Sequence, residues 1–506
     1  MIPPLAALYA WPIVVMILYR RYDLTTALIL SLIPAYLLLP VRVGVDFPVL
    51  PRFDKFSIPL LSALLFSFIA LRQLSANRRK NMPLGVLPGF LPRDPIMLGL
   101  VVLFIGGAFL TPLTNSDTLR YGPKTLQGLR PYDAFSSAMV AGMSLLPLLL
   151  ARKYLGHPDA HRRLLIIIAG CGILYAFLAL IEIRLSPQLS NWVYGVSVRD
   201  WAQQKREGGF RPVIFLEHSL WLGIFLATAT IAAFAVWRTK ISQQHKRFMF
   251  GAGLLLVTVV LSKTLGALMI TLVLLPVILM LNARQQMLAA AIIGGVVVTY
   301  PLLRSADLVP VDKVVGFAMK ISPERAGSLQ YRLNNEDILL EKAMQRPALG
   351  WGGWGRPRVY NEKGEDESTT DGRWVISIGL GGFARYFAEF GLLTLPMILL
   401  ALRKRRYEIT LITSSLCIVL CANLVDLIPN AGLTMVTWLM AGALIGRLEM
   451  ARVTDSDATA LEPAGRRQQR YHRGPQPGLD TAAPATDRAE GPRYTRFATK
   501  SRKAGV

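Results

Sequence analysis

The sequence predicts an all-α polytopic membrane protein with about twelve to thirteen transmembrane helices and one large external loop that contains an amphipathic helix. Apolar residues make up 53% of its 506 residues, whereas charged residues make up only 17%. This composition leaves too few polar residues to cover a soluble globular protein. The formal net charge is nevertheless +24, and in a lipid-embedded chain that excess must lie in the connections between helices.

A helix that crosses the hydrocarbon core needs about 20 mostly apolar residues, and runs of this kind recur along the chain. The run 248–282 is too long for a single span and is interrupted by Ser262, Lys263 and Thr264. We therefore interpret it as two short helices joined at a polar break. The predicted spans are 3–19, 24–40, 57–71, 95–113, 134–150, 164–183, 212–236, 248–262, 265–282, 287–303, 376–402, 409–428 and 433–446.

The basic residues predict the orientation of these spans, because Lys and Arg resist translocation and accumulate on the cytoplasmic side. If the N-terminus starts outside, every connection that falls inside is basic, with Lys or Arg at 20–21, 72–80, 152–163, 238–247, 284 and 403–406. The first apolar run lacks the positive flank of a signal peptide, so we expect it to be a retained helix.

The composition divides the chain into three regions. Residues 1–163 hold the N-terminal transmembrane helices, and residues 164–446 form a core with two long external segments, 184–211 and 304–375. Residues 447–506 switch to Arg, Pro, Gly, Ala and Thr with almost no large aliphatics, which predicts a disordered, basic cytoplasmic tail. We expect this tail to be solubilising, with weak attraction to anionic lipid headgroups as the alternative.

Three cysteines are too few for a disulfide scaffold. Cys417 and Cys421 lie one helical turn apart in an apolar run, and Cys171 lies in another. We interpret all three as small buried hydrophobes. The sequence shows no metal, haem or nucleotide motif, so we expect neither a cofactor nor a nucleic-acid partner.

Polar side chains gather at the outer ends of the predicted spans, at Glu182, Arg211, Glu217, His218, Lys263, Arg385, Glu389, Asn423 and Asp426. Charged groups near hydrocarbon are costly and mark functional sites by default, so we expect an outward-facing polar pocket. Structural explanations stay open for most of them. Arg385 and Glu389, at i and i+4, can neutralise each other, and Asn423 can hydrogen-bond within the bundle. Lys263 resists this explanation, because a Lys inside an apolar stretch must reach water or an anion.

The external segment 184–211 interleaves basic residues with Trp192, Tyr194 and Trp201. Aromatic faces stack on sugars, and Arg binds phosphate oxygens bidentately, so this segment suits a phosphorylated glycan. Anchoring of the tryptophans at the membrane interface is an equally good interpretation.

The external segment 304–375 contains two distinct patterns. Residues 328–345 carry apolar residues at helical spacing with charges between them, which predicts an amphipathic helix at the membrane surface or over the pocket. A turn with four glycines around Trp351 and Trp354 follows at 350–355. Glycine permits close backbone approach, and the two rings offer faces to a sugar. As a phosphate loop the turn is a weak signal, because no Walker lysine follows it.

Three of these features together resemble the O-antigen ligase and polysaccharide polymerase superfamily of bacterial inner-membrane enzymes. The run from Arg332 to Gly355 resembles the family's Arg-bearing amphipathic helix ending in P-x-x-G-x-G. Residues 208–212, with Arg211, resemble its Arg-bearing segment before a span. The break at 262–264 resembles its Ser-Arg-Gly break, with Lys263 in place of Arg.

One departure concerns the end of the large loop, where many ligases have a His-Asn pair and a glycine eleven residues after the His. In one alignment Asp371 takes the His position, because Gly382 follows at that distance. A second alignment, which matches residues 388–393 to the family's AExGLLG, puts Leu380 there. The usual histidine is absent in both, which favours a polymerase or a divergent exopolysaccharide member over a ligase.

The resemblance implies a metal-independent, inverting glycosyl transfer at the periplasmic face of a bacterial inner membrane. The donor would be a glycan on a polyprenyl pyrophosphate. The acceptor hydroxyl would belong to another lipid-linked glycan or a lipid core, and other polysaccharide assembly proteins would be partners. The N-terminus would be periplasmic and the C-terminal tail cytoplasmic.

Roles for the candidate residues follow from this chemistry. A departing pyrophosphate needs positive charge where its negative charge develops, and we predict Arg211 and Lys263 for this role, with Arg332 assisting. If the attacking hydroxyl needs a base, Asp371 is the first candidate and Glu217 the second. The tryptophans of the glycine-rich turn, Trp351 and Trp354, would contact the glycan.

Two other classes of function stay open. A transporter or flippase of lipid-linked glycan predicts inverted repeats and charges near the bilayer midplane, whereas the sequence shows no repeat and places most charges at the outer rim. An accessory subunit of an export complex would leave these charges without a common purpose. We therefore rank the glycosyltransferase first, the transporter second and the structural subunit third.

Overall fold

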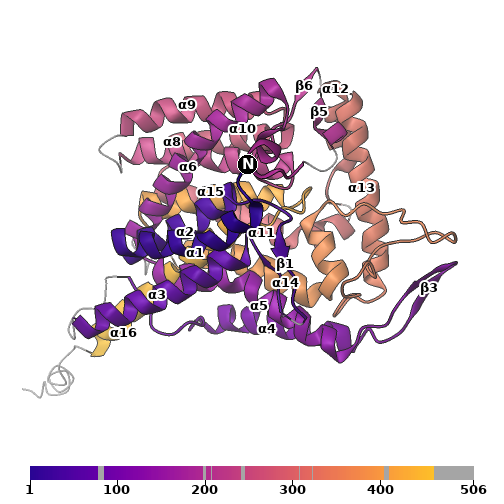
Figure 1. Cartoon of the computed structure of the whole chain (residues 1–506), viewed down its shortest axis with the longest axis horizontal. Coiled ribbons are helices and arrows are strands. Elements are labelled where there is room, and N and C mark those ends of the chain that lie inside the picture. The colour runs from indigo at the N-terminus through magenta and orange to yellow at the C-terminus, as the bar shows by residue number, and fades with distance from the viewer. Residues whose placement is uncertain are drawn as a thin grey trace, which may run out of the picture. The chain divides into compact units, whose positions relative to one another are not determined.

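The computed structural model describes all residues except 49, 78–84, 198–200, 207, 241–244, 307, 322, 404–408 and 461–506. The chain divides into two compact units, Met1–Asp455 and Ser456–Val506. Helices make up most of the described part of the first unit (Figure 1). The first eight are α1 (Pro4–Arg21), α2 (Leu24–Leu38), α3 (Ser57–Asn77), α4 (Pro95–Leu113), α5 (Pro131–Tyr154), α6 (Pro158–Leu185), α7 (Leu189–Tyr194) and α8 (Ser219–Thr239).

The second half of the chain is equally helical. Its helices are α9 (His245–Leu261), α10 (Leu265–Met280), α11 (Ala283–Ser305), α12 (Val311–Ile321), α13 (Pro323–Met344), α14 (Arg373–Leu402), α15 (Leu411–Asp426) and α16 (Met435–Ala460). Each predicted span falls on one of these helices or one in the first half. The polar break after Leu261 and the amphipathic helix at 328–345, now α13, are confirmed.

The protein is a multi-pass, all-α membrane protein. Six of the described helices, namely α4, α5, α6, α8, α11 and α14, are long and apolar enough to cross a membrane. Shorter apolar helices accompany them at α2, α10, α15 and the first part of α3. Large apolar side chains such as Val102, Leu174 and Val273 are exposed on outward faces of these helices, as lipid-facing residues are. The total of twelve or thirteen crossings stays a prediction.

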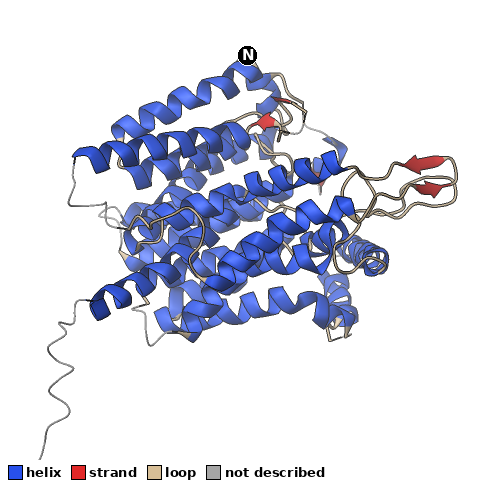
Figure 2. Cartoon of the chain, turned by 90° about the horizontal axis from the view of Figure 1, so that it is seen from below, coloured by secondary structure: helices blue, strands red, loops and turns tan. Residues whose placement is uncertain are grey.

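Within the described residues, strands form three short antiparallel hairpins in connections between helices, as Figure 2 illustrates. The first pairs β1 (Gly44–Val45) with β2 (Phe53–Asp54), and the second pairs β3 (Leu119–Tyr121) with β4 (Lys124–Leu126). The third pairs β5 (Lys205–Arg206) with β6 (Gly209–Phe210) after a single 3-10 turn, η1 (Trp201–Gln204).

The core lies around α8 and α15, which are buried along most of their length. Helix α8 packs against α6, α9, α10 and α15, and α11 packs against α14 and α15. Small residues allow this close packing: a Cβ on Gly172 of α6 would lie 2.2 Å from the Cβ of Ala229 on α8. Cys417 and Cys421 are fully buried in α15, as predicted, whereas Cys171 is only partly buried.

Polar contacts join the connections into two groups, one at each end of the helices. We call the end with the basic connections, such as 152–163, the basic end, and the end with the long segments 184–211 and 304–375 the loop end. At the basic end, Arg152 binds Glu449 on α16 and Arg163 binds Asp23. At the loop end, connections far apart in sequence meet through three bonds: the Ile2 amide to Val193 O, Lys55 Nζ to Phe215 O, and Lys342 Nζ to Tyr121 Oη. The connections joined by these contacts lie at the ends that the alternating topology predicts. Which end faces the periplasm stays a prediction.

The predicted start of the disordered tail at residue 447 is wrong, because α16 continues to Ala460. The first of the added turns is held by packing and charge: Leu448 is fully buried, and Glu449 accepts hydrogen bonds from Arg152 and from the backbone of Arg93. The sequence gives little sign of this, because Met450 and Val453 are the only large apolar residues between Leu448 and Leu461. The rest of the predicted tail, 461–506, lies outside the described residues.

Candidate functional site

Three of the predicted site residues, Arg211, Lys263 and Arg332, line one pocket of about 160 Å³ at the loop end. They come from three separate parts of the chain: the segment before α8, the break between α9 and α10, and the middle of α13. We call this group of three residues the cation pocket. Ser328 and Leu329, one turn before Arg332, complete its α13 wall.

Lys263 owes its position to the way α9 ends. Its φ of +55° lies in the left-handed region, which turns the chain sharply before α10 begins at Leu265. A Cβ on Gly209 would lie 2.7 Å from Lys263 Nζ. The missing side chain of Gly209 therefore makes room for the ammonium group beside the Arg211 segment.

Buried side chains from other elements hold the segment 211–216. Glu182 of α6 accepts the backbone N–H groups of Val213 and Ile214, both at 2.8 Å. Tyr175 Oη accepts the N–H of Phe215 at 3.3 Å, and Lys55 Nζ donates to the Phe215 carbonyl at 2.9 Å. Irregular backbone near hydrocarbon needs such internal partners. Glu182 is thus a structural residue that shapes the segment carrying Arg211.

Lys55 is a site residue that sequence reasoning missed. Its side chain is only 2% exposed, and burial lowers its pKa to about 7, although the nearby carboxylates of Glu217 and Asp54 favour its charged form. The charge of Glu217 thus acts on Lys55, and Glu217 is not among the residues that line the cation pocket. No pattern marks Lys55 in the sequence, because it stands between a short hairpin and a span.

Arg332 connects the cation pocket to the start of α14. Its Nη1 donates to Asn430 Oδ1 at 3.1 Å, and its Nε lies 3.4 Å from Asp371 Oδ2. Both side chains of the Arg332–Asp371 pair are partly exposed. The structure thus brings Asp371, the first base candidate, beside Arg332 of the cation pocket, whereas Glu217 is not in the pocket lining.

Glu336 lies one helical turn beyond Arg332 on α13 and was also missed. It is 4% exposed, and its Oε1 accepts the indole N–H of Trp374 at 3.3 Å. Burial raises the pKa of Glu336 to about 7, with Asp371 among the charges that add to the rise. The i, i+4 spacing from Arg332 was the available signal, since it places both side chains on one helix face.

The glycine-rich turn has a structural role that its sequence did not reveal. Helix α14 breaks at Gly381 and Gly382, the latter with φ +65°, which leaves backbone groups without helical partners. The segment 347–352 supplies them. Four bonds join the two: the N–H groups of Trp351 and Gly352 to the carbonyls of Gly379 and Leu380, and the N–H groups of Phe383 and Ala384 to the carbonyls of Pro347 and Ala348.

Glycine is required on both sides of this junction. A Cβ on Gly350 would lie 2.6 Å from the backbone nitrogens of Gly381 and Gly382. A Cβ on Gly382 would lie 2.3 Å from the carbonyl carbon of Ala348. The P-x-x-G-x-G pattern at 347–352 is thus a docking segment for the broken helix.

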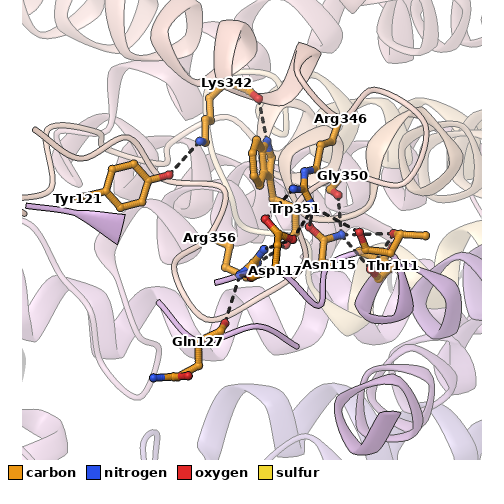
Figure 3. A network of polar contacts seen from close by, with 11 residues as sticks. Thr111, Asn115, Asp117, Tyr121, Gln127, Lys342, Arg346, Gly350, Trp351 and Arg356 are labelled. Carbon is orange, nitrogen blue, oxygen red and sulfur yellow. Dashed lines mark hydrogen bonds and ion pairs between the residues drawn. The ribbon is translucent and has the colours of Figure 1, made fainter. Parts of the chain in front are cut away.

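A second group of cations fixes this segment to α4 and to the connection after it, and we call it the Asp117 network (Figure 3). Arg346 Nη2 donates to Asp117 Oδ2 at 2.8 Å, and the fully buried Arg356 donates to Asp117 Oδ1 at 3.1 Å. Burial opposes the charge of Asp117, but the hydrogen bonds and charge of Arg346 outweigh it and lower the pKa of this carboxyl. Asn115 Nδ2 also donates to the Gly350 carbonyl at 3.0 Å.

The two tryptophans of the turn differ in accessibility. Trp351 is 5% exposed, its Nε1 donates to the Lys342 carbonyl, and Lys342 and Arg346 lie over its ring. The structure therefore leaves Trp351 no open face for a sugar, unlike the predicted role. Trp354 is 79% exposed and its predicted contact with glycan is geometrically open.

The predicted pairing of Arg385 with Glu389 is only part of a larger cluster. Arg385 Nε lies 3.6 Å from Glu389 Oε2, but Arg373 binds both oxygens of Glu389 at 2.5 and 2.8 Å. Ser377 also donates to Glu389. Sequence reasoning missed Arg373, because its spacing of sixteen residues from Glu389 matches no helical pair and depends on the break in α14.

The other polar residues at the loop end have structural partners. His218 caps α8 by accepting the N–H of Leu220, Asn423 donates to Thr228, and Asp426 accepts from Asn430. The structural explanation of Asn423 and Asp426 is thus confirmed. Across the described residues, His, Cys, Asp and Glu side chains form no group of three or more that could hold a metal ion.

Comparison with known proteins identifies the family of the central region. A family model described as O-antigen ligase matches residues 250–395, a stretch that contains Lys263, Arg332 and Asp371. None of the curated proteins compared matches the chain. The match at 250–395 supports membership of the chain in the O-antigen ligase and polysaccharide polymerase superfamily.

Proposed function

We propose that the protein transfers a glycan from a polyprenyl pyrophosphate to the hydroxyl of a lipid-linked acceptor at the loop end. The observation that carries this proposal is the cation pocket: three basic residues from distant parts of the chain line one cavity beside Asp371. Membership of the superfamily supports glycosyl transfer of the ligase or polymerase type. The loop end would face the periplasm, because every connection at the opposite end is basic.

The cation pocket would stabilise the leaving group. In the transfer, the acceptor oxygen forms a bond to the anomeric carbon as the bond from that carbon to the pyrophosphate oxygen breaks. The electron pair of the broken bond remains on the pyrophosphate, so negative charge grows there in the transition state. Arg211, Lys263 and Arg332 line the cavity where that charge would lie, and fixed positive charge at this point lowers the barrier. Attack opposite to the leaving group inverts the anomeric centre.

Asp371 would accept the proton of the acceptor hydroxyl. Its carboxylate lies 3.4 Å from the Arg332 guanidinium and is partly exposed, so it can meet both the pocket and an incoming hydroxyl. Glu217, the second candidate, is not among the residues that line the cation pocket, which favours Asp371 as the base. No metal ion takes part in this proposed mechanism.

Polymerisation is the proposed form of the transfer. The family histidine that many ligases have near this position is replaced by Asp371 or Leu380, depending on the alignment. The acceptor would then be a second lipid-linked glycan, and the donor a growing chain on its carrier. Other polysaccharide assembly proteins would supply these substrates in a bacterial inner membrane.

The lipid-linked product profile of membranes with and without the protein tests this proposal. We expect single repeat units on the carrier to accumulate without the protein. Accumulation of long carrier-linked chains would instead indicate a ligase, and an unchanged profile on the periplasmic side would indicate a transporter and contradict the proposal.

Two variants connect the profile to the cation pocket. Arg211→Ala and Lys263→Ala should abolish long-chain glycan while the amount of protein in the membrane stays unchanged. Wild-type polymer length in either variant would remove the role of the cation pocket in pyrophosphate binding. Asp371→Asn tests the base, and full activity of this variant would make Asp371 a loop residue only.

A further inference from the structure

A second and larger cavity, of about 630 Å³, lies between α4, α5, α14 and α16. This volume is within the range of sites for small organic ligands. Arg373 and Arg385 line it, and we call it the arginine cavity. It adjoins the candidate site through the start of α14, because Asp371 pairs with Arg332 and Arg373 follows two residues later. The backbone N–H of Arg373 also donates to the carbonyl of Asn430, whose side chain binds Arg332.

The arginine cluster at this cavity carries one positive charge more than its carboxylate neutralises. Glu389 is fully buried and is held by Arg373 through two hydrogen bonds and by Ser377 through a third. Arg385 meets Glu389 only as an ion pair at 3.6 Å, and its buried Nε has no hydrogen-bond partner among the described residues. Its guanidinium lies over the ring of Phe104. The Arg385 side chain is 25% exposed and lines the cavity, so an anion bound there could complete the neutralisation of this charge within a span.

The remaining lining suits a sugar attached to that anion. Ser136, Ser137 and Ser144 present hydroxyls along one face of α5, and the exposed ring of Trp354 lies at the cavity. Hydroxyls bond sugar hydroxyls, and an indole face stacks on a sugar ring. Asp133, in the first turn of α5, is a carboxylate in the lining, and its Oδ2 accepts the N–H of Arg130.

In a lipid-linked saccharide the phosphate lies next to the lipid and the sugar follows it. The cavity has the same order, with an arginine at depth and the groups that suit a sugar nearer the loop end. Ser144 lies eleven residues beyond Asp133 on α5, which corresponds to about 16 Å along a helix. Arg385 lies twelve residues beyond Arg373 in α14, past the helix break. The cavity thus extends from Asp133 and Trp354 at the loop end to an arginine at the depth of the spans.

We propose that the arginine cavity binds the phosphate-bearing head of the acceptor lipid, with the phosphate on Arg385 and Arg373 and the first sugar along α5 and Trp354. Identification of this lipid as the acceptor rests on the proposed function. The start of α14 would then connect the two phosphate sites, because Asp371 pairs with Arg332 of the cation pocket and Arg373, two residues later, lines the arginine cavity.

Native mass spectrometry of the detergent-purified, full-length protein tests the proposal, with farnesyl diphosphate as the probe. We expect two molecules to bind per chain. Arg385→Gln should weaken one of them at least about tenfold, as loss of a buried charge partner does, and Lys263→Gln should weaken the other. The double variant should bind neither. Arg385→Gln suits this test because Glu389 keeps Arg373 and Ser377 as partners.

A second variant removes the site without changing any charge. Ser137→Leu should fill part of the arginine cavity and also eliminate one bound diphosphate. The control is Arg358→Gln, which removes a partly exposed arginine at the loop end that pairs with Asp366, and it should still bind two. Two bound molecules in both Arg385→Gln and Ser137→Leu would overturn the proposal.

The same experiment separates the two proposals and the two sources of lipid phosphate. If Arg385→Gln loses one molecule while Lys263→Gln loses none, the arginine cavity stands and the cation pocket fails as the pyrophosphate site. Retention of the Arg385-dependent diphosphate in excess dioctanoyl phosphatidylglycerol would support a carrier lipid. Its displacement by an equal concentration of this phospholipid would overturn the assignment to the acceptor.

Discussion

The cation pocket and the Asp117 network both gather basic residues at the loop end, but their surroundings differ. In the network, Arg346 and Arg356 share the carboxylate of Asp117, and backbone carbonyls accept their remaining hydrogen bonds. In the cation pocket, three basic residues line a cavity, and the carboxylate beside it, Asp371, is partly exposed. The two groups of basic residues thus differ in what they border: the network joins one carboxylate to backbone carbonyls, whereas the cation pocket opens onto a cavity.

The largest effect on stability is expected at the junction between the segment 347–352 and the break in α14. Gly382→Ala should lower the free energy of unfolding by about 3 kcal/mol or more, because the new Cβ meets the Ala348 backbone and a positive φ is strained for alanine. Thermal unfolding in detergent measures this. Gly353→Ala is the control, since its Cβ would meet no atom within 4 Å. Equal stability of the two variants would show that the 347–352 segment does not depend on this junction.

The next effect concerns Glu336, which lies between the two regions. Its raised pKa means that the folded state holds a proton between pH 4.5 and about 7 that the unfolded state releases. Stability should therefore fall as the pH rises through this window, by about 2–3 kcal/mol in total. Glu336→Gln should be more stable than wild type at pH 8 and equally stable at pH 4.

Thermal unfolding at several pH values tests the Glu336 prediction. The matched control is Glu341→Gln, an exposed residue on the same helix, which should keep the pH dependence of wild type. If Glu336→Gln also keeps it, another group causes the dependence.

A smaller effect is expected when the network loses charge but keeps its shape. Asp117→Asn should reduce stability by about 1–2 kcal/mol, because the buried Arg356 retains its carbonyl partners but loses a carboxylate. Transfer activity per folded molecule should stay unchanged. Asp46→Asn, in an exposed pair with Arg52, should change stability by less than about 0.5 kcal/mol. A loss of activity without a loss of stability in Asp117→Asn would place the network in the active site.

The smallest effect is expected in the cation pocket, and it concerns the transfer rate rather than stability. Gly209→Ala puts a methyl group 2.7 Å from Lys263 Nζ, and the flexible lysine can move away at little cost in stability. The displaced ammonium should reduce the transfer rate by about threefold to tenfold. Steady-state transfer by membranes with equal protein content measures this. A rate equal to that of wild type would mean that the position of the ammonium is not critical.

The sequence predicted the helices far better than the irregular segments between them. Thirteen apolar runs, the break at Lys263 and the amphipathic α13 were all evident from composition and spacing, because each depends on local pattern. The extension of α16 was not, since it depends on the distant Arg152. The break in α14 was also missed, because its backbone groups are satisfied by a segment about thirty residues earlier in the chain.

Site residues could be predicted where the local sequence or the family resemblance marks them, but not where their role depends on tertiary contacts. Lys263 stood out because a charge in an apolar run must reach water or an anion. Arg211 was found as a charge at the outer end of a predicted span, and Arg332 through the family resemblance. Lys55 and Arg373 were not found, because their roles depend on tertiary contacts with Phe215 and Glu389. Trp351 was predicted for sugar binding from its residue type, but the same aromatic ring serves as a packing surface for cations.

The transfer rate of purified Lys263→Gln, measured together with its thermal midpoint, tests the central claim most directly. We expect the rate to fall at least about 100-fold, as loss of a transition-state charge partner does, while the midpoint stays within about 2 °C of wild type. Arg346→Gln, the corresponding change in the Asp117 network, should show the reverse pattern. A rate for Lys263→Gln within about threefold of wild type would contradict the role of the cation pocket in the reaction.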